Sequence, residues 1–183
     1  MLSHENFRML YLNDGEEERE LLHGVYARLE AEGTAKRTFY DGTVTNAEEF
    51  VAHMLCPGSL PFLLFWDGKP AGITWFNSCE GRSARGHFVL FRDVWGRETT
   101  AAIGRGIFTY MLTLKDNIGF FFDVLLGLTP ASNSLAWRLG MLCGAKEVGS
   151  IPMGIFNARS GRAEDAKLYY VTRDVLGISE KET

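Results

Sequence analysis

The chain has 183 residues, of which 46% are hydrophobic and 23% charged, and its formal net charge is −4. This length allows one domain with a two-layer core, and the composition is that of an ordinary soluble globular protein. The negative charge argues against a general nucleic-acid binder or a membrane-surface binder. Three cysteines without C-x-x-C spacing indicate reduced thiols, so we expect a cytoplasmic protein. No apolar run reaches the ~18 residues of a membrane helix, and residues 1–13 lack the layout of a signal peptide.

Residues 1–58 are predicted to form one strand and two helices. The strand is expected at Phe7–Leu12. Five carboxylates between Asp14 and Glu20 suit the first turn of the first helix, where the helix dipole favours negative charge. The alternative is an acidic lip that attracts an amine substrate. Gly33–Thr43 is predicted to be a loop, and Thr45-x-x-Glu48 is predicted to be the capping box of the second helix.

Residues 60–92 are predicted to form an antiparallel meander. Pro61–Trp66 and Ala71–Phe76 are apolar runs that flank Asp67-Gly68, which is a strong hairpin signal. Lys69-Pro70 is expected to lengthen that turn. Arg85–Arg92 is predicted to be the next strand.

Residues 93–152 are predicted to form a helix, a strand and a second helix. The first helix is expected over Glu98–Lys115 and crosses back to the apolar run Phe120–Leu128, which suits a strand covered on both faces. Thr129-Pro130 is predicted to begin the next helix, and Gly144 to end it. A strand region at 153–176 and a tail at 177–183 follow. An antiparallel meander followed by a strand–helix–strand crossover predicts a mixed sheet with helices on both faces.

The second half of the chain also carries a set of motifs in a fixed order. They are Thr129-Pro130-x-x-Asn133-x-x-Ala136-x-Arg138-Leu139, Gly144-Ala145-x-x-x-Gly149-x-Ile151-Pro152, His87-Phe88, Trp95-Gly96 and Gly161-x-x-x-Asp165-Ala166-x-Leu168-Tyr169. Over roughly residues 60–172 their order and spacing resemble the GNAT N-acetyltransferase superfamily. The resemblance implies a single α/β domain of the GNAT type, with a mixed, mostly antiparallel sheet, and acetyl-CoA as the co-substrate. No metal is implied.

Residues 82–105 form a candidate anion site. They carry a local charge of +3 on an acidic protein and include the start of the crossover helix, whose free N–H groups suit a pyrophosphate. The alternative is a set of surface arginines around an ordinary helix start. The arginines are Arg82, Arg85, Arg92, Arg97 and Arg105.

The resemblance assigns the CoA pyrophosphate to the loop that opens this helix. The family pattern there is Arg/Gln-x-x-Gly-x-Gly/Ala, and the corresponding positions in this chain include Gly96, Arg97, Thr99 and Thr100. Both later glycines of the pattern are missing. An alternative register lies one turn later, near Arg105.

The resemblance also implies contacts to the rest of the cofactor. A main-chain N–H near Val89, Leu90 or Phe91 is expected to polarise the thioester carbonyl. Asn133, which opens the fourth helix of the family pattern, is expected to contact the pantetheine arm. Trp137, one turn later on the same face, either lines the cofactor groove or packs in the core.

Three residues are candidates for the base that deprotonates the amine. His87 has the most suitable intrinsic pKa and lies inside the strand that should line the site; the alternative is a structural histidine. Asp123 interrupts an apolar run, and its alternative role is a structural hydrogen bond. Glu80 lies in a predicted turn, and its alternative role is a solvated surface carboxylate.

The proton donor to the thiolate departs from the family pattern. The tyrosine seven residues after the helix-opening asparagine is Gly140 in this chain, and the phenylalanine that closes the helix is Ala145. Tyr169, Tyr170, Ser134 or a water are the candidate replacements, or the thiolate leaves unassisted.

The leading hypothesis is transfer of an acetyl group from acetyl-CoA to the amine of an unidentified small-molecule or protein acceptor. The alternative is a CoA-binding module without turnover that acts as a sensor or structural subunit. We expect a monomer or a homodimer, and no nucleic-acid or membrane partner.

Overall fold

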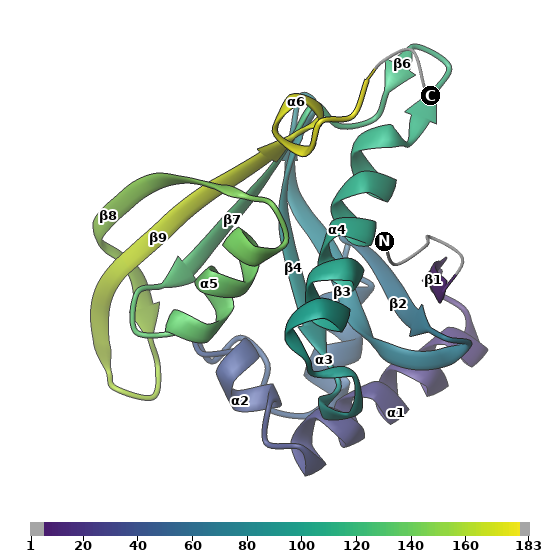
Figure 1. Ribbon diagram of the computed structural model, residues 1–183. Helices are drawn as coiled ribbons and strands as arrows, with labels where there is room; N and C mark the ends of the chain where they lie inside the picture. The colour runs from purple at the N-terminus through teal and green to yellow at the C-terminus, as the bar shows by residue number, and fades with distance from the viewer. Residues whose placement is uncertain (1–5, 180–183) are drawn as a thin grey trace. The chain divides into compact units, whose positions relative to one another are not determined.

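The computed structural model describes residues 6–179 (Figure 1). Seven strands within these residues are hydrogen-bonded in the order β1-β2-β3-β4-β7-β9-β8, and helices flank them. The β4–β7 pair is parallel, whereas the β1–β2, β2–β3 and β7–β9 pairs are antiparallel. The sheet is therefore mixed and mostly antiparallel, which confirms the predicted α/β fold class.

The chain divides into two compact units. The first takes in the residues up to Asn77, together with His87–Trp95 and Phe156–Arg162. The second takes in Ser78–Gly86, Gly96–Ile155 and the residues from Ala163 onward. Strand β4 (Ser83–Leu90) begins in the second unit and ends in the first.

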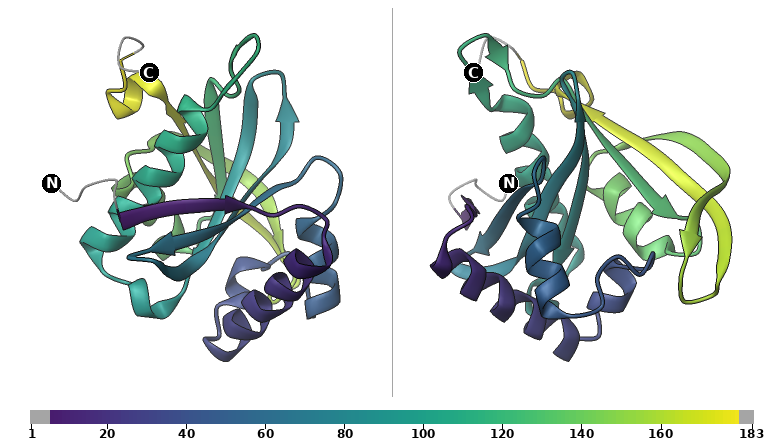
Figure 2. Two further views of the ribbon diagram at one scale, coloured as in Figure 1. Left: turned by 90° about the vertical axis from the view of Figure 1, so that its right-hand side faces the viewer. Right: turned by 180° about the vertical axis from the view of Figure 1, so that it is seen from behind.

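In the first unit, helices α1 and α3 pack side by side and share one hydrophobic core with the strands (Figure 2). Leu63, Ile73 and Trp75 face these helices because the side chains of a strand alternate between its two faces. The elements are β1 (Phe7–Tyr11), α1 (Glu16–Ala31), α2 (Ala35–Thr38), α3 (Ala47–Met54), β2 (Leu60–Trp66) and β3 (Lys69–Glu80).

The β2–β3 hairpin has a tighter turn than the sequence predicted. Trp66 pairs with Lys69, so Asp67 and Gly68 alone form the turn, with φ values of 49° and 75°. Two residues with positive φ match the twist of a hairpin. Pro70 lies within β3, opposite Phe65, beside an irregularity of the ladder. The expectation that Lys69-Pro70 lengthens the turn is wrong.

Helix α3 begins one residue later than predicted. Asn46 is the N-cap, and its side chain accepts a 2.9 Å hydrogen bond from the Glu49 N–H. Glu49 reaches back to the N–H and hydroxyl of Thr45, each at 2.7 Å. The predicted capping box Thr45-x-x-Glu48 is therefore wrong: Asn46 is the N-cap, and Glu49 is the carboxylate that reaches back, to the residue before the cap. The predicted loop Gly33–Thr43 contains the short helix α2.

In the second unit, β7 pairs with β4 on one side and β9 on the other, and α5 packs on β7 (Figure 1). Helix α4 contacts both α5 and α6. The elements are α4 (Arg97–Thr113), the small hairpin β5 (Lys115–Asp116) and β6 (Gly119–Phe120), β7 (Val124–Pro130), α5 (Ser134–Leu142), β8 (Lys146–Asn157), β9 (Arg162–Thr172) and α6 (Arg173–Leu176).

Two boundaries in this unit differ from the prediction. The apolar run Phe120–Leu128 is not one strand, because Phe120 belongs to the hairpin and β7 begins at Val124. Thr129-Pro130 does not begin a helix: both residues end β7, opposite Lys167 and Ala166 of β9. The missing N–H of Pro130 is tolerated at a strand end.

Within residues 6–179, no helix combines the length and the apolar character needed to cross a membrane. Gly177, the first residue of the predicted tail, is the left-handed C-cap of α6, with φ 70°. Residues 180–183 of that tail lie outside the described residues.

Candidate active site

His87 lies on β4 in the first unit, and residues of β3 contact both its ring and its backbone. Its imidazole stacks on the indole of Trp75, with the ring centroids 4.9 Å apart and the planes 5° from parallel. Its Nε2 lies 3.2 Å from the Oδ1 of Asn77. The carbonyl of His87 accepts a 2.6 Å hydrogen bond from the Thr74 hydroxyl. Both the ring and the backbone of this histidine therefore have defined positions.

Trp75 is part of a larger group of rings. It also stacks on Phe39, at 5.6 Å and 20°, and His53 meets the edges of both rings. Burial lowers the pKa of His53, so this imidazole is neutral near pH 7. The indole N–H of Trp75 is buried and has no hydrogen-bond partner among the described residues. An unpaired buried donor costs about 1–3 kcal/mol.

At the end of β4, the main-chain N–H and carbonyl groups of successive residues point alternately toward β3 and away from it. The N–H of Phe91 donates to the Ala71 carbonyl on β3, at 2.9 Å, and the Val89 carbonyl lies close to Gly72 on the same strand. Leu90, between them, therefore directs its N–H and carbonyl away from β3. Its carbonyl accepts a 2.9 Å hydrogen bond from the indole of Trp95. Of the three predicted carbonyl-polarising residues, Leu90 is the one whose N–H does not face β3.

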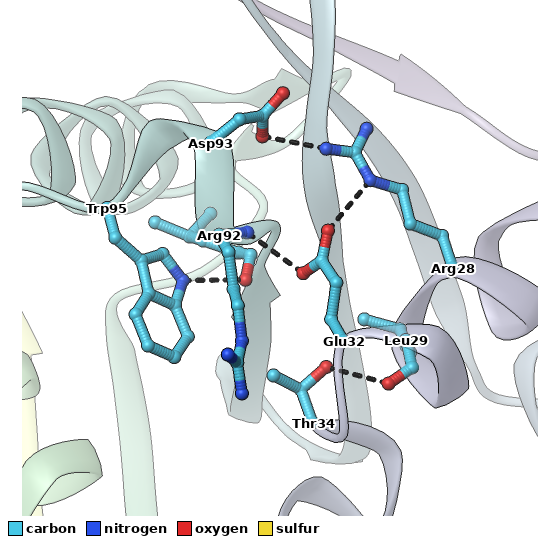
Figure 3. Close-up of polar contacts among 8 residues, drawn as sticks. Arg28, Leu29, Glu32, Thr34, Arg92, Asp93 and Trp95 are labelled. Carbon is cyan, nitrogen blue, oxygen red and sulfur yellow. Dashed lines mark hydrogen bonds and ion pairs between the residues drawn. The ribbon is translucent and has the colours of Figure 1, made fainter.

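The turn after β4 is tied to the end of α1 by an ion-pair network (Figure 3). Glu32 accepts the backbone N–H of Arg92 at 2.8 Å with one oxygen and the Nε of Arg28 at 2.9 Å with the other. Arg28 also pairs with Asp93, at 2.8 Å. The guanidinium of Arg92 turns away from these groups and lies 5.5 Å from the ring of Trp95. The network holds the chain just before the predicted pyrophosphate loop.

That loop opens α4 in the second unit. The N–H of Gly96 donates to the hydroxyl of Thr100, at 3.2 Å, and the N–H of Thr100 returns to the Gly96 carbonyl at 2.8 Å. The first-turn N–H groups after Gly96 have no partner inside the helix. Arg97 is exposed and Thr99 half-buried beside them. These donors fit a phosphate, whereas the exposed Glu98 in the same turn opposes one.

Helix α5 is capped by Asn133, whose side-chain oxygen accepts the N–H of Ala136 at 3.3 Å. The indole of Trp137 donates to the Ala131 carbonyl, at 3.3 Å. Lys167, on β9, lies 5.5 Å from the same ring. Trp137 is half-buried and fixed by the turn that precedes its own helix.

Tyr169 on β9 lies between two glycines of this unit. A Cβ at Gly127, its partner on β7, would lie 1.8 Å from the phenol ring, and a Cβ at Gly140 on α5 would lie 3.1 Å from it. The hydroxyl is 3.0 Å from that of Thr129. Burial is the main cause that raises the pKa of Tyr169, so the phenol is protonated near pH 7.

The other two predicted bases are placed differently. Asp123 forms an ion pair with Arg173, whose guanidinium also donates to the carbonyls of Leu112 and Phe122. Glu80 is the last residue of β3 and not, as the sequence predicted, part of a turn; its side chain is exposed, and its carbonyl accepts the Ser83 hydroxyl. The ion pair favours the structural alternative for Asp123, and the exposure favours the solvated alternative for Glu80.

No group of three or more His, Cys, Asp or Glu side chains in residues 6–179 could hold a metal ion.

The structure of this chain is similar to solved structures of known proteins. No protein-family model matches the sequence, and no curated protein matches it. A spermidine N-acetyltransferase from Vibrio cholerae, solved with CoA and spermine, has a TM-score of 0.69 at 14% identity, over 93% of this chain and 98% of that chain. An acetyltransferase from Salmonella typhimurium that modifies the N-terminal serine of ribosomal protein L7/L12 has a TM-score of 0.72 at 15% identity, over 92% and 95% of the two chains. A ribosomal L7/L12 N-acetyltransferase solved with CoA has a TM-score of 0.67 at 15% identity.

The chain has the GNAT N-acetyltransferase fold.

Within the GNAT fold, Tyr169 explains the departure at Gly140. The space that a side chain at Gly140 would enter is filled by the phenol of Tyr169, which comes from β9 and not from the helix. A tyrosine at both positions would collide. Glycine at position 140 therefore fits the position of the Tyr169 ring.

Sequence reasoning placed His87 on β4 but missed its partners. Trp75 and Asn77 are two residues apart on β3, which is the spacing of side chains on one face of a strand. That spacing indicates that the two side chains share one face of β3, but not that His87 lies on the same face. The network of Arg28, Glu32 and Asp93 was also missed, because Asp93 lies about 60 residues after Arg28 and Glu32 in the sequence.

Proposed function

We propose that the protein is an acetyl-CoA-dependent N-acetyltransferase that acts in the cytoplasm on the amine of a small molecule or a protein. The observation that carries the proposal is the extent of the GNAT fold, which covers 98% and 95% of two N-acetyltransferase chains. Those enzymes were solved with spermine or act on a protein N-terminus, and both are amine acceptors. This likeness supports an amine as the class of acceptor.

The residues of the chain have defined roles in this proposal. Acetyl-CoA supplies an activated acetyl group, and the first-turn amides of α4, with Gly96, Arg97, Thr99 and Thr100, bind its pyrophosphate. The N–H of Leu90, flanked by Val89 and Phe91, donates to the thioester carbonyl. Asn133 and Trp137 contact the pantetheine arm.

Two groups move protons. His87 takes a proton from the acceptor amine, so that the nitrogen lone pair can attack. Tyr169, which burial keeps protonated, donates to the departing thiolate. Asp123 and Glu80 remain secondary candidates for the base.

A CoA-binding module without turnover is the second candidate. Two predicted cofactor groups already have partners inside the protein: the side-chain oxygen of Asn133 caps α5, and the N–H of Gly96 binds Thr100. These internal contacts compete with contacts to CoA. They therefore favour weaker CoA binding than a site in which both groups were available to the cofactor.

One experiment separates the two candidates. Thermal unfolding is measured with and without millimolar CoA, and acetyl-CoA consumption is measured with spermine, with a peptide that has an N-terminal serine and with other amines. A ligand at 100 times its Kd stabilises the folded state by about 2.7 kcal/mol. A thermal shift with turnover that His87→Gln abolishes supports the enzyme. A shift without turnover supports the module, and the absence of a shift overturns both.

A further inference from the structure

The contact between His87 and Asn77 determines which imidazole nitrogen carries a proton. The Oδ1 of Asn77 is a carbonyl oxygen, which only accepts hydrogen bonds. At 3.2 Å it requires a proton on the Nε2 of His87. A neutral imidazole has one N–H, so its basic lone pair then lies on Nδ1.

We propose that Asn77 is a positioning residue that holds His87 in the Nε2–H tautomer, so that Nδ1 is the atom that receives the proton of the acceptor amine. This inference rests on the proposed function. Asn77 keeps its role throughout the step, because Nε2 is a donor in both the neutral and the charged ring. Its hydrogen bond strengthens as the ring becomes positive, since charge-assisted hydrogen bonds are the stronger ones.

Trp75 is the second positioning residue. Its indole lies 5° from parallel to the imidazole at 4.9 Å, so tilting of the His87 ring would bring the two rings into collision. The face of an indole also attracts a positive charge. His53 is a second titratable group at these rings, and it meets the edge of Trp75. Burial keeps it neutral, so it adds no charge that would oppose a positive His87.

The proton transfer balances as follows. Nδ1 of His87 accepts one proton from the acceptor ammonium, which leaves a neutral amine. The amine nitrogen forms a bond to the thioester carbonyl carbon, and the carbon–sulfur bond then breaks. The thiolate takes a proton from Tyr169, which regains it from the second N–H of the former amine. The products are an amide and free CoA thiol, and His87 releases its proton to solvent.

The first test measures the tautomer without any turnover. Nitrogen-15 spectra of histidine-labelled protein above the histidine titration range distinguish a protonated from an unprotonated ring nitrogen, and His87→Gln identifies the signals. We expect protonated Nε2 and unprotonated Nδ1 in the parent protein, and a mixture of tautomers in Asn77→Leu. A proton on Nδ1 in the parent protein overturns the proposal, whatever the activity of the enzyme.

The second test measures kcat and KM against pH. We expect Asn77→Leu to lower kcat about tenfold or more, within the range of general base catalysis, with little change in the KM for acetyl-CoA. Asn77→Asp, which is nearly the same shape, keeps an acceptor at Nε2. It should restore most of kcat and shift the acidic limb of the profile to higher pH, because a carboxylate favours the charged imidazole.

The outcomes separate this inference from the proposed function. Turnover that is unchanged in Asn77→Leu, or a limb that does not move in Asn77→Asp, overturns the role of Asn77 while the acetyltransferase stands. Absence of turnover with every amine overturns the catalytic part together with the proposed function, and the spectra still decide the tautomer. Thermal unfolding of each variant shows whether a loss of turnover is caused by misfolding. If Asn77→Leu is misfolded, only Asn77→Asp is compared with the parent protein.

Discussion

Tyr169 is accommodated because its two neighbours have no side chains. Its ring covers Gly127 on the paired strand and touches Gly140 on α5, and its hydroxyl reaches Thr129. An aromatic ring over a glycine on the neighbouring strand fills the space that the missing side chain leaves. The position of this phenol is therefore fixed by packing as well as by its hydrogen bond.

Gly127→Ala should destabilise the protein strongly. A Cβ at this position would lie 1.8 Å from the Tyr169 ring, and overpacking of this kind costs about 1–3 kcal/mol or more. Urea unfolding gives the loss. In a Tyr169→Ala background, Gly127→Ala should cost much less, because the colliding ring is gone.

Gly24→Ala is the matched control for that substitution. Gly24 lies in α1 with nothing within 4 Å of a Cβ, and alanine in a helix is more stable than glycine by about 0.5–1 kcal/mol. Equal losses in Gly24→Ala and Gly127→Ala would contradict the packing argument.

His53 should make the stability depend on pH. Burial lowers its pKa below the unfolded value of about 6.5, so the unfolded chain binds this proton more readily than the folded one. The stabilisation is complete above the unfolded pKa and is lost as the pH falls through the lower, folded pKa. The difference in Tm between pH 7.5 and pH 5.5 should be smaller in His53→Gln than in the parent protein. An identical difference would show that other groups set the acid sensitivity.

At the level of elements, helix α1 and the turn after β4 are joined by Glu32 (Figure 3). Glu32→Ala should speed hydrogen exchange of the Arg92 amide about tenfold or more, because a hydrogen bond to a charged group contributes roughly 1.5–3 kcal/mol. Glu30→Ala is the control, since Glu30 is an exposed residue of the same helix. Slow exchange that survives in Glu32→Ala would mean that other contacts hold the turn.

The sequence predicted most elements because their signals are local. Apolar periodicity identified α1 and α4, and Asp67-Gly68 identified the β2–β3 turn. It misplaced the start of α5, because Thr129 and Pro130 are favourable at a helix start and also pair with β9. Both residues belong to a strand because they pair with β9, about 37 residues later in the chain. The local sequence pattern contains no information about this pairing.

The partners of His87 were missed for a similar reason. A regular hairpin about Gly81-Arg82 would place His87 opposite Phe76, on the other face from Trp75 and Asn77. Ser78 has a φ of 50°, a conformation that a serine rarely adopts, and it interrupts this alternation. Nothing in the residue type of Ser78 indicates the irregularity.

At the scale of the whole molecule, the three cysteines report on folding. Cys56 and Cys79 are exposed, whereas Cys143 is buried and its pKa is raised to about 12 by burial. A thiol reagent at pH 8 should modify two thiols in the native protein and the third only on unfolding. Cys143→Ser should give two thiols in both states. Rapid reaction of three thiols in the native parent protein would contradict the burial of Cys143.

The position of β9 in the sheet has a consequence for synthesis on the ribosome. Among the described strands β9 is the last to be made, but it lies between β7 and β8. Gly127 of β7 is made before Tyr169, its partner on β9. Strand β7 therefore leaves the ribosome with one edge unpaired. Unpaired strand edges can pair with other chains. Translation that stalls between these two residues would therefore release a chain prone to aggregation, and slow codons before β9 should lower the soluble yield more than slow codons after Thr172.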